Sequence, residues 1–151
     1  MDALVELKEI TKDNIDDVLA LRVSEEQSGF VQSTTYSLAR AWAFRNTAFP
    51  FAVYANGVVV GFIMLGYYEL KGQYTVWQFL IDERFQNKGY GREALRLGIR
   101  LLIDRFDVKE VYLGVKHDNI AAKKLYSSFG FVDTGETTET AVEMKMVIDD
   151  K

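Results

Sequence analysis

Hydrophobic residues recur along the chain with two different periods, and short polar or glycine-containing segments separate the stretches that carry them. Alternating or continuous apolar runs predict strands, because successive side chains of a strand point to opposite faces. Apolar residues at every third or fourth position predict helices. Strands are expected over 4–10, 51–54, 58–68, 74–81, 111–115, 131–134 and 141–148. Helices are expected from 15 to about 22, from 34 or 35 to about 45, over 89–106 and over 119–129.

The order of these elements predicts the fold class. Only one unit, formed by 74–81, 89–106 and 111–115, has the strand–helix–strand form that connects parallel strands. The earlier strands follow one another through short turns such as Asn56-Gly57, which predicts antiparallel hairpins. We therefore expect a single α+β domain over 1–151. Its sheet should be mixed, mostly antiparallel and twisted, with six or seven strands flanked by about four helices.

Composition narrows the classes of function. The chain has 151 residues, of which 48% are hydrophobic, and this suits one domain with a full core. It has no cysteine and one histidine, which excludes thiolate and multi-histidine metal sites, so no metal is expected. The net charge of −4 disfavours nucleic acid as a partner. No apolar run is long enough to span a membrane and the N-terminus lacks a signal-peptide core, so we expect a soluble, cytoplasmic protein with no membrane partner.

Two glycines stand one residue apart where the longest helix begins. Gly89 and Gly91 let the backbone approach a ligand closely, and the free N–H groups of the first helical turn favour an anion there. Lys88 and Arg92 add positive charge, so the stretch indicates phosphate or pyrophosphate binding. A helix entry that merely contains glycine is the alternative. The dinucleotide fingerprint also fits through Ala94, but it requires its first glycine directly after the strand and several crossover units, and the chain has neither.

The segment 86–91 has the form Q-x-x-G-x-G, and three further features accompany it. A strand leads directly into it, Asn119 and Tyr126 lie seven residues apart on a later helix, and the sequence Phe-Gly-Phe over 129–131 closes that helix. With these features the chain resembles the GNAT superfamily of N-acetyltransferases, whose corresponding loop binds the pyrophosphate of acetyl-CoA. The resemblance is specific over 77–131 and weaker elsewhere.

The resemblance implies roles for individual residues. Two strands are expected to splay apart to admit the pantetheine arm of acetyl-CoA, and a backbone N–H within 79–81 to donate to the thioester oxygen. Tyr126 is expected to protonate the leaving thiolate, and Asn119 to hydrogen-bond the pantetheine. A core role is the alternative for Tyr126, which shares a helix face with apolar residues. The expected cofactor-binding residues are Phe79, Leu80, Ile81, Gln86, Asn87, Lys88, Gly89, Tyr90, Gly91, Arg92, Asn119 and Tyr126.

Two stretches, 77–86 and 23–39, make the chain similar to the small diamine and polyamine (spermidine/spermine) acetyltransferases of that superfamily. The resemblance implies that a primary amine of a small cationic acceptor attacks acetyl-CoA directly in a ternary complex. Glu25, Glu26 and Trp77 are the expected substrate contacts, since acids pair with ammonium groups and aromatic faces attract them. Members of the family are often dimers, so a homodimer is a further expectation.

The general base is the role that the sequence defines least. Five acids are candidates, although for each the role of an ordinary solvated surface acid suits better: Glu69, Glu83, Asp82, Glu25 and Glu26. Asp82 and Glu83 can instead hold the loop. The lone His117 has a suitable intrinsic pKa, but a surface or capping role suits it better. Two alternatives stay open for the function. The acceptor can be another amine, such as a protein N-terminus, a lysine, an amino acid or a drug, or the chain can be a non-catalytic acyl-CoA-binding module.

Overall fold

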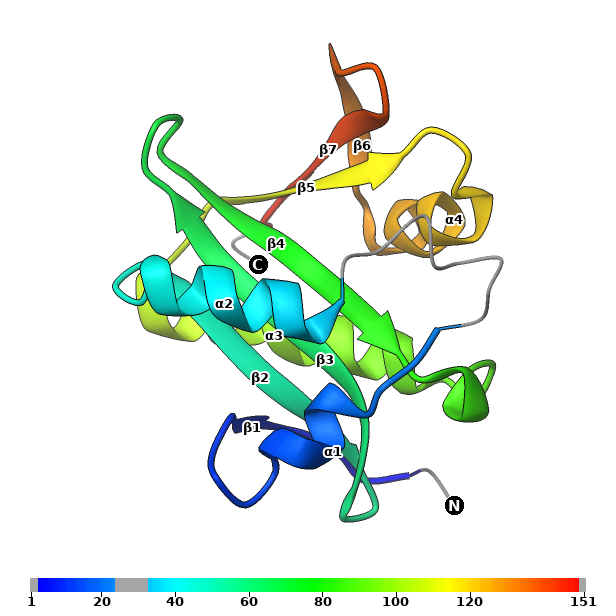
Figure 1. Cartoon of the computed structure of the whole chain (residues 1–151). Helices are drawn as coiled ribbons and strands as arrows, with labels where there is room; N and C mark the ends of the chain where they lie inside the picture. Colours follow the sequence, from blue (N-terminus) through cyan, green and yellow to red (C-terminus); the bar gives the residue numbers. More distant parts are fainter. Residues whose placement is uncertain (1–2, 24–32, 150–151) are drawn as a thin grey trace.

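A computed structural model describes residues 3–23 and 33–149 of the chain. This described part forms one seven-stranded sheet with the strand order β1-β2-β3-β4-β5-β7-β6 (Figure 1). The strands are β1 (Val5–Glu9), β2 (Ala48–Ala55), β3 (Val58–Tyr68), β4 (Gln73–Ile81), β5 (Glu110–Lys116), β6 (Val132–Thr137) and β7 (Ala141–Val147). The helices are α1 (Ile15–Leu19), α2 (Thr34–Ala43), α3 (Tyr90–Phe106) and α4 (Ile120–Phe129), with a 3₁₀-helix η1 (Glu83–Phe85).

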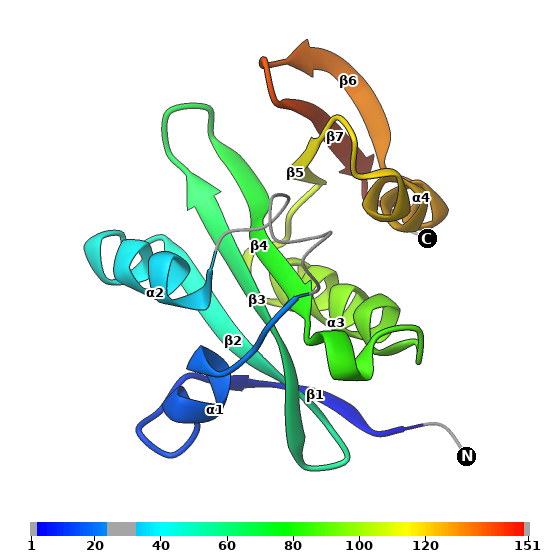
Figure 2. The ribbon, with the colours of Figure 1, turned by 45° about the vertical axis from the view of Figure 1, so that its right-hand side comes forward.

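The helices cover both faces of the sheet (Figure 2). α1 and α2 lie on one face, α3 lies on the other, and α4 packs beside β5 and β7. The central strand β3 is therefore buried on both sides: Phe62 belongs to the core under α1 and α2, whereas Ile63 and Leu65 belong to the core under α3. Double burial explains why β3 is an almost continuous apolar run instead of an alternating one.

Strand directions confirm the predicted topology. β1 to β4 form an antiparallel meander, and α3 connects β4 to β5 in parallel. β7 then pairs with β5 and β6 in antiparallel fashion. The predicted α+β class, the mixed sheet and the four helices are thus confirmed for the described residues.

The sheet opens between its two halves. β4 and β5 pair at only two positions, Thr75 with Tyr112 and Val76 with Leu113, although β4 continues to Ile81. Beyond Val76 the two strands therefore part. The splayed strands expected from the resemblance are present, and the split faces the start of α3 and the start of α4.

The predicted bounds were wrong by about three residues at the end of α1, at the end of β6 and at the start of β2. β2 begins at Ala48, before Pro50, although a proline there was expected to precede the strand. Pro50 pairs with Met64 of β3 on one side, and on the other side β1 ends opposite Phe51. Because Pro50 lies beyond the end of β1, this part of β2 is an edge of the sheet. On that side no strand needs a hydrogen bond from the N–H that proline lacks.

Candidate active site

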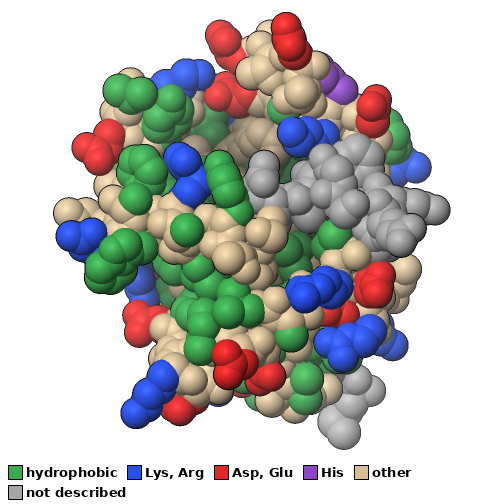
Figure 3. Space-filling view, viewed as in Figure 1, with side chains coloured by type: hydrophobic (Ala, Val, Ile, Leu, Met, Phe, Trp, Pro, Cys, Tyr) green, Lys and Arg blue, Asp and Glu red, His purple; other side chains and the backbone are tan. Residues whose placement is uncertain are grey.

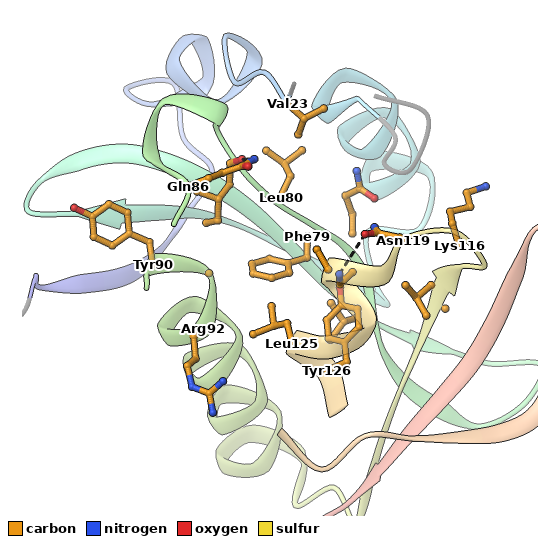
Figure 4. A pocket seen from close by; sticks show the side chains of 18 of the residues that line it. Val23, Phe79, Leu80, Gln86, Tyr90, Arg92, Lys116, Asn119, Leu125 and Tyr126 are labelled. Carbon is orange, nitrogen blue, oxygen red and sulfur yellow. Dashed lines mark hydrogen bonds between the residues drawn. The ribbon is translucent and has the colours of Figure 1, made fainter. Parts of the chain in front are cut away.

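A cleft of about 810 Å³ follows the split between β4 and β5. Figure 4 shows its walls: Phe79 lies at the centre opposite Leu125 and Tyr126 of α4, while Tyr90 and Arg92 lie at the end where α3 begins. Most of the predicted cofactor-binding residues line this cleft. They are Phe79, Leu80, Ile81, Gln86, Asn87, Gly89, Tyr90, Gly91, Arg92, Asn119 and Tyr126.

A bulge in β4 accompanies the split. Met64 of β3 pairs with Gln78 and Leu65 pairs with Val76, which leaves Trp77 between them without a partner in the register. The ring of Trp77 covers Gly66, where an added Cβ would come within 2.5 Å of it. A bulge bends its strand and strengthens the local twist. This bulge begins where β4 leaves β5, so it contributes to the opening of the cleft.

The start of α3 presents free backbone N–H groups. The first helical bond runs from the N–H of Glu93 to the carbonyl of Gly89 at 3.2 Å, so the N–H groups of 90–92 precede the bonded part of the helix. Gly89 has φ of +85°, a conformation that favours glycine. Apart from its neighbours along the chain, no described residue comes within 4 Å of the position of its absent Cβ. The 17-residue helix adds its dipole at this end. Backbone amides and open space together make an anion-binding site.

Side chains fix the loop before α3. Gln86 donates from Nε2 to the carbonyl of Ile81 at 2.8 Å, which folds the loop back onto the end of β4. Arg92 donates to the hydroxyl of Ser128 at 2.7 Å and lies over the ring of Phe129, so it joins α3 to α4 across the cleft. Gln86 therefore has a structural task in the loop in addition to its place in the cleft wall.

The acid that ends β4 is a buried anchor. Asp82 is 1% exposed and accepts hydrogen bonds from the backbone and side chain of Arg84 and from the backbone N–H of Arg22 at 3.0 Å. The N–H of Glu83 returns a bond to the carbonyl of Arg22 at 2.8 Å. Burial alone would raise the pKa of Asp82, but the hydrogen bonds from Arg84 and Arg22 outweigh it and lower that pKa. Asp82 thus joins the loop before α3 to the segment after α1.

Tyr126 lies in the cleft wall with its ring against Phe131, at 5.9 Å between ring centroids. It is 9% exposed, and this burial raises the pKa of Tyr126 to about 12, so the hydroxyl stays protonated at neutral pH. Within the described ranges that hydroxyl has no hydrogen-bond partner. Asn119 caps α4, where its Oδ1 accepts from the N–H of Ala122 at 3.2 Å, so only its amide NH₂ is left to donate to a ligand.

A second cleft of about 410 Å³ lies between the turn joining β3 to β4 and the β6–β7 hairpin. Thr75, Tyr112 and Glu143 line it, and Val76 and Leu113 border it at the split. Thr75 and Tyr112 alternate with Val76 and Leu113, whose side chains belong to the core under α3, so the side chains of Thr75 and Tyr112 point to the α2 side of the sheet. Figure 3 shows this face hollowed between the two hairpins, with acidic and basic side chains along the rim. Val76, Trp77, Gly114 and Ala141 line both clefts, so the two meet at the split.

Carboxylates distinguish the second cleft from the first, and one lysine, Lys71, also lines it. Glu136 and Glu143 line it together with Tyr68, Trp77 and Tyr112. The hydroxyl of Tyr112 donates to Glu110 at 2.6 Å. This bond, together with burial and the negative charges of Glu110 and Glu143, raises the pKa of Tyr112 to about 12. The arrangement suits a cationic ligand.

Sequence reasoning missed Glu143, although a signal was present. The alternation over 141–148 places Ala141, Glu143 and Lys145 on one face, opposite apolar Val142 and Met144. The sequence alone does not predict the register of β7 against β5, and it is this register that places Glu143 directly opposite Gly114.

Several predicted site residues lie away from both clefts. Glu69 is exposed in the turn after β3 and Glu83 is exposed in η1, and neither lines a cleft, so the geometry does not favour either as a base. Lys88 is exposed within the loop before α3 and lines neither cleft. Glu25 and Glu26 fall outside the described residues. Trp77, in contrast, lies where the two clefts meet.

Comparison with known proteins identifies the family. Residues 15–131 match the model of the acetyltransferase (GNAT) family. The chain belongs to the GNAT acetyltransferase family. This confirms the resemblance drawn from the segment 86–91, Asn119 and Tyr126.

Relatives of this acetyltransferase include curated and solved proteins. It is 36% identical over 138 residues to the spermine/spermidine N(1)-acetyltransferase of Bacillus subtilis, an alignment that covers 87% of this chain and 90% of that protein. It is 35% identical, with the same coverage, to the probable spermine N(1)-acetyltransferase of Bacillus subtilis subsp. natto. The spermidine N-acetyltransferase of Vibrio cholerae in complex with CoA and spermine has the same fold, with a TM-score of 0.77, 17% identity and 95% coverage of both chains.

The described residues also bear on metal binding and on membrane spanning. Within 3–23 and 33–149, no three His, Cys, Asp or Glu side chains gather as metal ligands would. In the same part of the chain no helix has the length and apolar character needed to cross a membrane.

Proposed function

We propose that this acetyltransferase transfers the acetyl group of acetyl-CoA to a primary amine of a polyamine such as spermidine or spermine. The observation that carries the proposal is the meeting of two different clefts at one split in the sheet. One has an anion-binding helix start at its end, and the other has carboxylates and aromatic rings. The names of the Bacillus relatives, spermine/spermidine and spermine acetyltransferases, agree with a polycationic acceptor.

Acetyl-CoA occupies the larger cleft. Its diphosphate binds the N–H groups of 90–92, where the free amides, the helix dipole and the space at Gly89 favour an anion. The pantetheine arm then follows β4 towards the bulge at Trp77. This brings the thioester near the position where both clefts share Gly114. A backbone N–H within 79–81 is placed to donate to the thioester oxygen as it gains negative charge.

The attacking amine must be neutral. At about pH 7.4 a primary amine of pKa about 10.4 is roughly three units below its pKa, which corresponds to a penalty near 4 kcal/mol for the neutral form. The acceptor loses its proton to a base or to water and attacks the thioester carbonyl directly, and the bond from carbon to sulfur breaks. The nitrogen gains the acetyl group, and CoA leaves as a thiolate.

Tyr126 stabilises that thiolate. A thiol has a pKa of about 8.5, so complete proton transfer from a tyrosine of pKa about 12 would be uphill by roughly 3.5 units, or about 5 kcal/mol. A hydrogen bond from the neutral hydroxyl to the developing negative charge avoids this penalty. Tyr126 therefore acts as a hydrogen-bond donor to sulfur, and solvent completes the protonation.

The acceptor binds in the smaller cleft. Its ammonium groups pair with Glu143 and Glu136, and its methylene segments lie along the faces of Trp77, Tyr68 and Tyr112. Because Glu143 lies opposite Gly114 in the sheet, an amine held there is beside the split. Acetyl-CoA and the acceptor, on opposite faces of the sheet, thus meet at Gly114, which has no side chain to separate them.

The test is a panel of acceptors, with thiol release followed at saturating acetyl-CoA. Spermidine and spermine should be acetylated with a much higher kcat/KM than a monoamine of matched length, because only the polyamines carry the additional charges that the carboxylates bind. A peptide with a free N-terminus, a free amino acid and a lysine peptide complete the panel. Preference for any of these over the polyamines would contradict the acceptor assignment and leave the family unchanged.

A further inference from the structure

Glu143 presents one carboxylate oxygen to the second cleft. Its side chain is only 20% exposed, and its Oε1 accepts a hydrogen bond from the hydroxyl of Thr134 at 2.9 Å. That bond fixes the orientation of the carboxylate on β7, directly opposite Gly114. The other oxygen, Oε2, faces Lys71.

Lys71 reaches the same oxygen from a different part of the chain. It lies in the turn between β3 and β4, and its Nζ is 3.6 Å from Oε2 of Glu143. Charge-assisted N–H···O bonds are about 2.7–2.9 Å long, so this pair is loose. The side chain of Lys71 is 47% exposed, which leaves it free to move into solvent.

We propose that Lys71 is a specificity-determining residue whose ammonium group occupies the place at Glu143 that an ammonium group of the acceptor takes. The inference rests on the proposed function, in which the second cleft binds the polyamine. A lysine ammonium and a primary ammonium of a polyamine are the same chemical group on a flexible methylene chain. The acceptor therefore displaces Lys71, forms a shorter bond to Oε2, and sends the lysine into solvent.

Removing Lys71 should change acceptor affinity in the opposite direction to removing a residue that binds the acceptor. Removing a group that contacts the acceptor would weaken acceptor binding. Removing a competitor instead strengthens it, because the carboxylate no longer has to release an internal cation. The effect should depend on Glu143 and should be felt by the amine, not by acetyl-CoA, which binds on the other face of the sheet.

Lys71→Met tests this, because methionine keeps the length of the side chain and removes its charge. We expect the KM for spermidine to fall about twofold to fivefold, the size that partly exposed ion pairs support, while the KM for acetyl-CoA stays the same. Lys109→Met is the matched control: Lys109 also forms a loose pair, with Asp107 at 3.4 Å, and lines neither cleft. In a Glu143→Gln background, Lys71→Met should no longer change the KM for spermidine.

An unchanged or higher KM for spermidine in the Lys71→Met enzyme would overturn the inference, as would the same fall in KM in the Glu143→Gln background. Either result would leave the proposed function intact, because polyamine turnover itself would still be observed. If the original enzyme acetylated no polyamine, the proposed function would fail and the inference with it.

Discussion

Removing the hydroxyl of Tyr126 tests the chemistry at the split. Tyr126→Phe deletes one oxygen and keeps the ring against Phe131. A hydrogen bond to a charged group contributes about 1.5–3 kcal/mol, so kcat should fall roughly 10- to 150-fold. Within the described residues no partner is recorded for the hydroxyl, so its loss leaves no buried group unpaired and the melting temperature should hardly change.

The pH dependence sharpens this test. A tyrosine stops donating as the pH rises through its pKa, and burial raises the pKa of Tyr126 to about 12. At pH 10 about 1% of such a hydroxyl is ionised, whereas an ordinary tyrosine of pKa about 10 would be half ionised. The ratio of original to Tyr126→Phe kcat should therefore stay constant from pH 7 to about 10, measured by thiol release at saturating substrates.

The exposed Tyr36 on α2 provides the matched control, since Tyr36→Phe removes a hydroxyl that lines neither cleft. A kcat of Tyr126→Phe within twofold of the original would refute the role of the hydroxyl. A ratio that halved by pH 10 would refute the raised pKa.

Two further changes test the parts that hold acetyl-CoA. Gly89→Val places a branched side chain at φ of +85° where the diphosphate is proposed to bind. It should weaken CoA binding about tenfold or more, because the backbone is strained by about 1–2 kcal/mol and the side chain keeps the diphosphate away from the N–H groups. Gly57→Val, at φ of +82° in a hairpin distant from the clefts, should lower stability similarly and leave CoA affinity measured by calorimetry unchanged; equal losses would contradict the site. Asp82→Asn should lower the free energy of unfolding by about 1–3 kcal/mol at neutral pH. The folded state lowers the pKa of Asp82, so the ionised carboxylate contributes stability above its unfolded pKa, near 3.9, and loses that contribution as the pH falls through its folded pKa. The melting temperatures of the original and Asp82→Asn proteins should therefore converge at acid pH. A difference in melting temperature that stayed constant with pH would contradict this.

The proposed coenzyme site could be drawn from the sequence because its residues are local. The segment from Gln86 to Arg92 contains the turn, the glycines and the helix start in sequence order, and the structure keeps them together. The crossover unit was also readable, since a strand, a long amphipathic helix and a second buried strand follow one another directly.

The proposed acceptor site could not be drawn from the sequence in the same way, because its cleft is assembled from distant segments. Glu143 enters the cleft only through the pairing of β7 with β5, and Lys71 only through the turn after β3. Glu69 and Glu83 were chosen as acids near strand ends, but a strand end does not specify which side of a turn faces a ligand. The bulge at Trp77 depends on the register between β3 and β4, which the residues of β4 alone do not reveal.

The most direct test of the whole account is a crystal structure of the protein with CoA and spermidine. The account predicts the diphosphate at the N–H groups of 90–92, the sulfur within hydrogen-bond distance of the Tyr126 hydroxyl, and a spermidine nitrogen at Glu143 on the opposite face of the sheet. A diphosphate bound elsewhere, or spermidine and CoA that do not meet at Gly114, would contradict it.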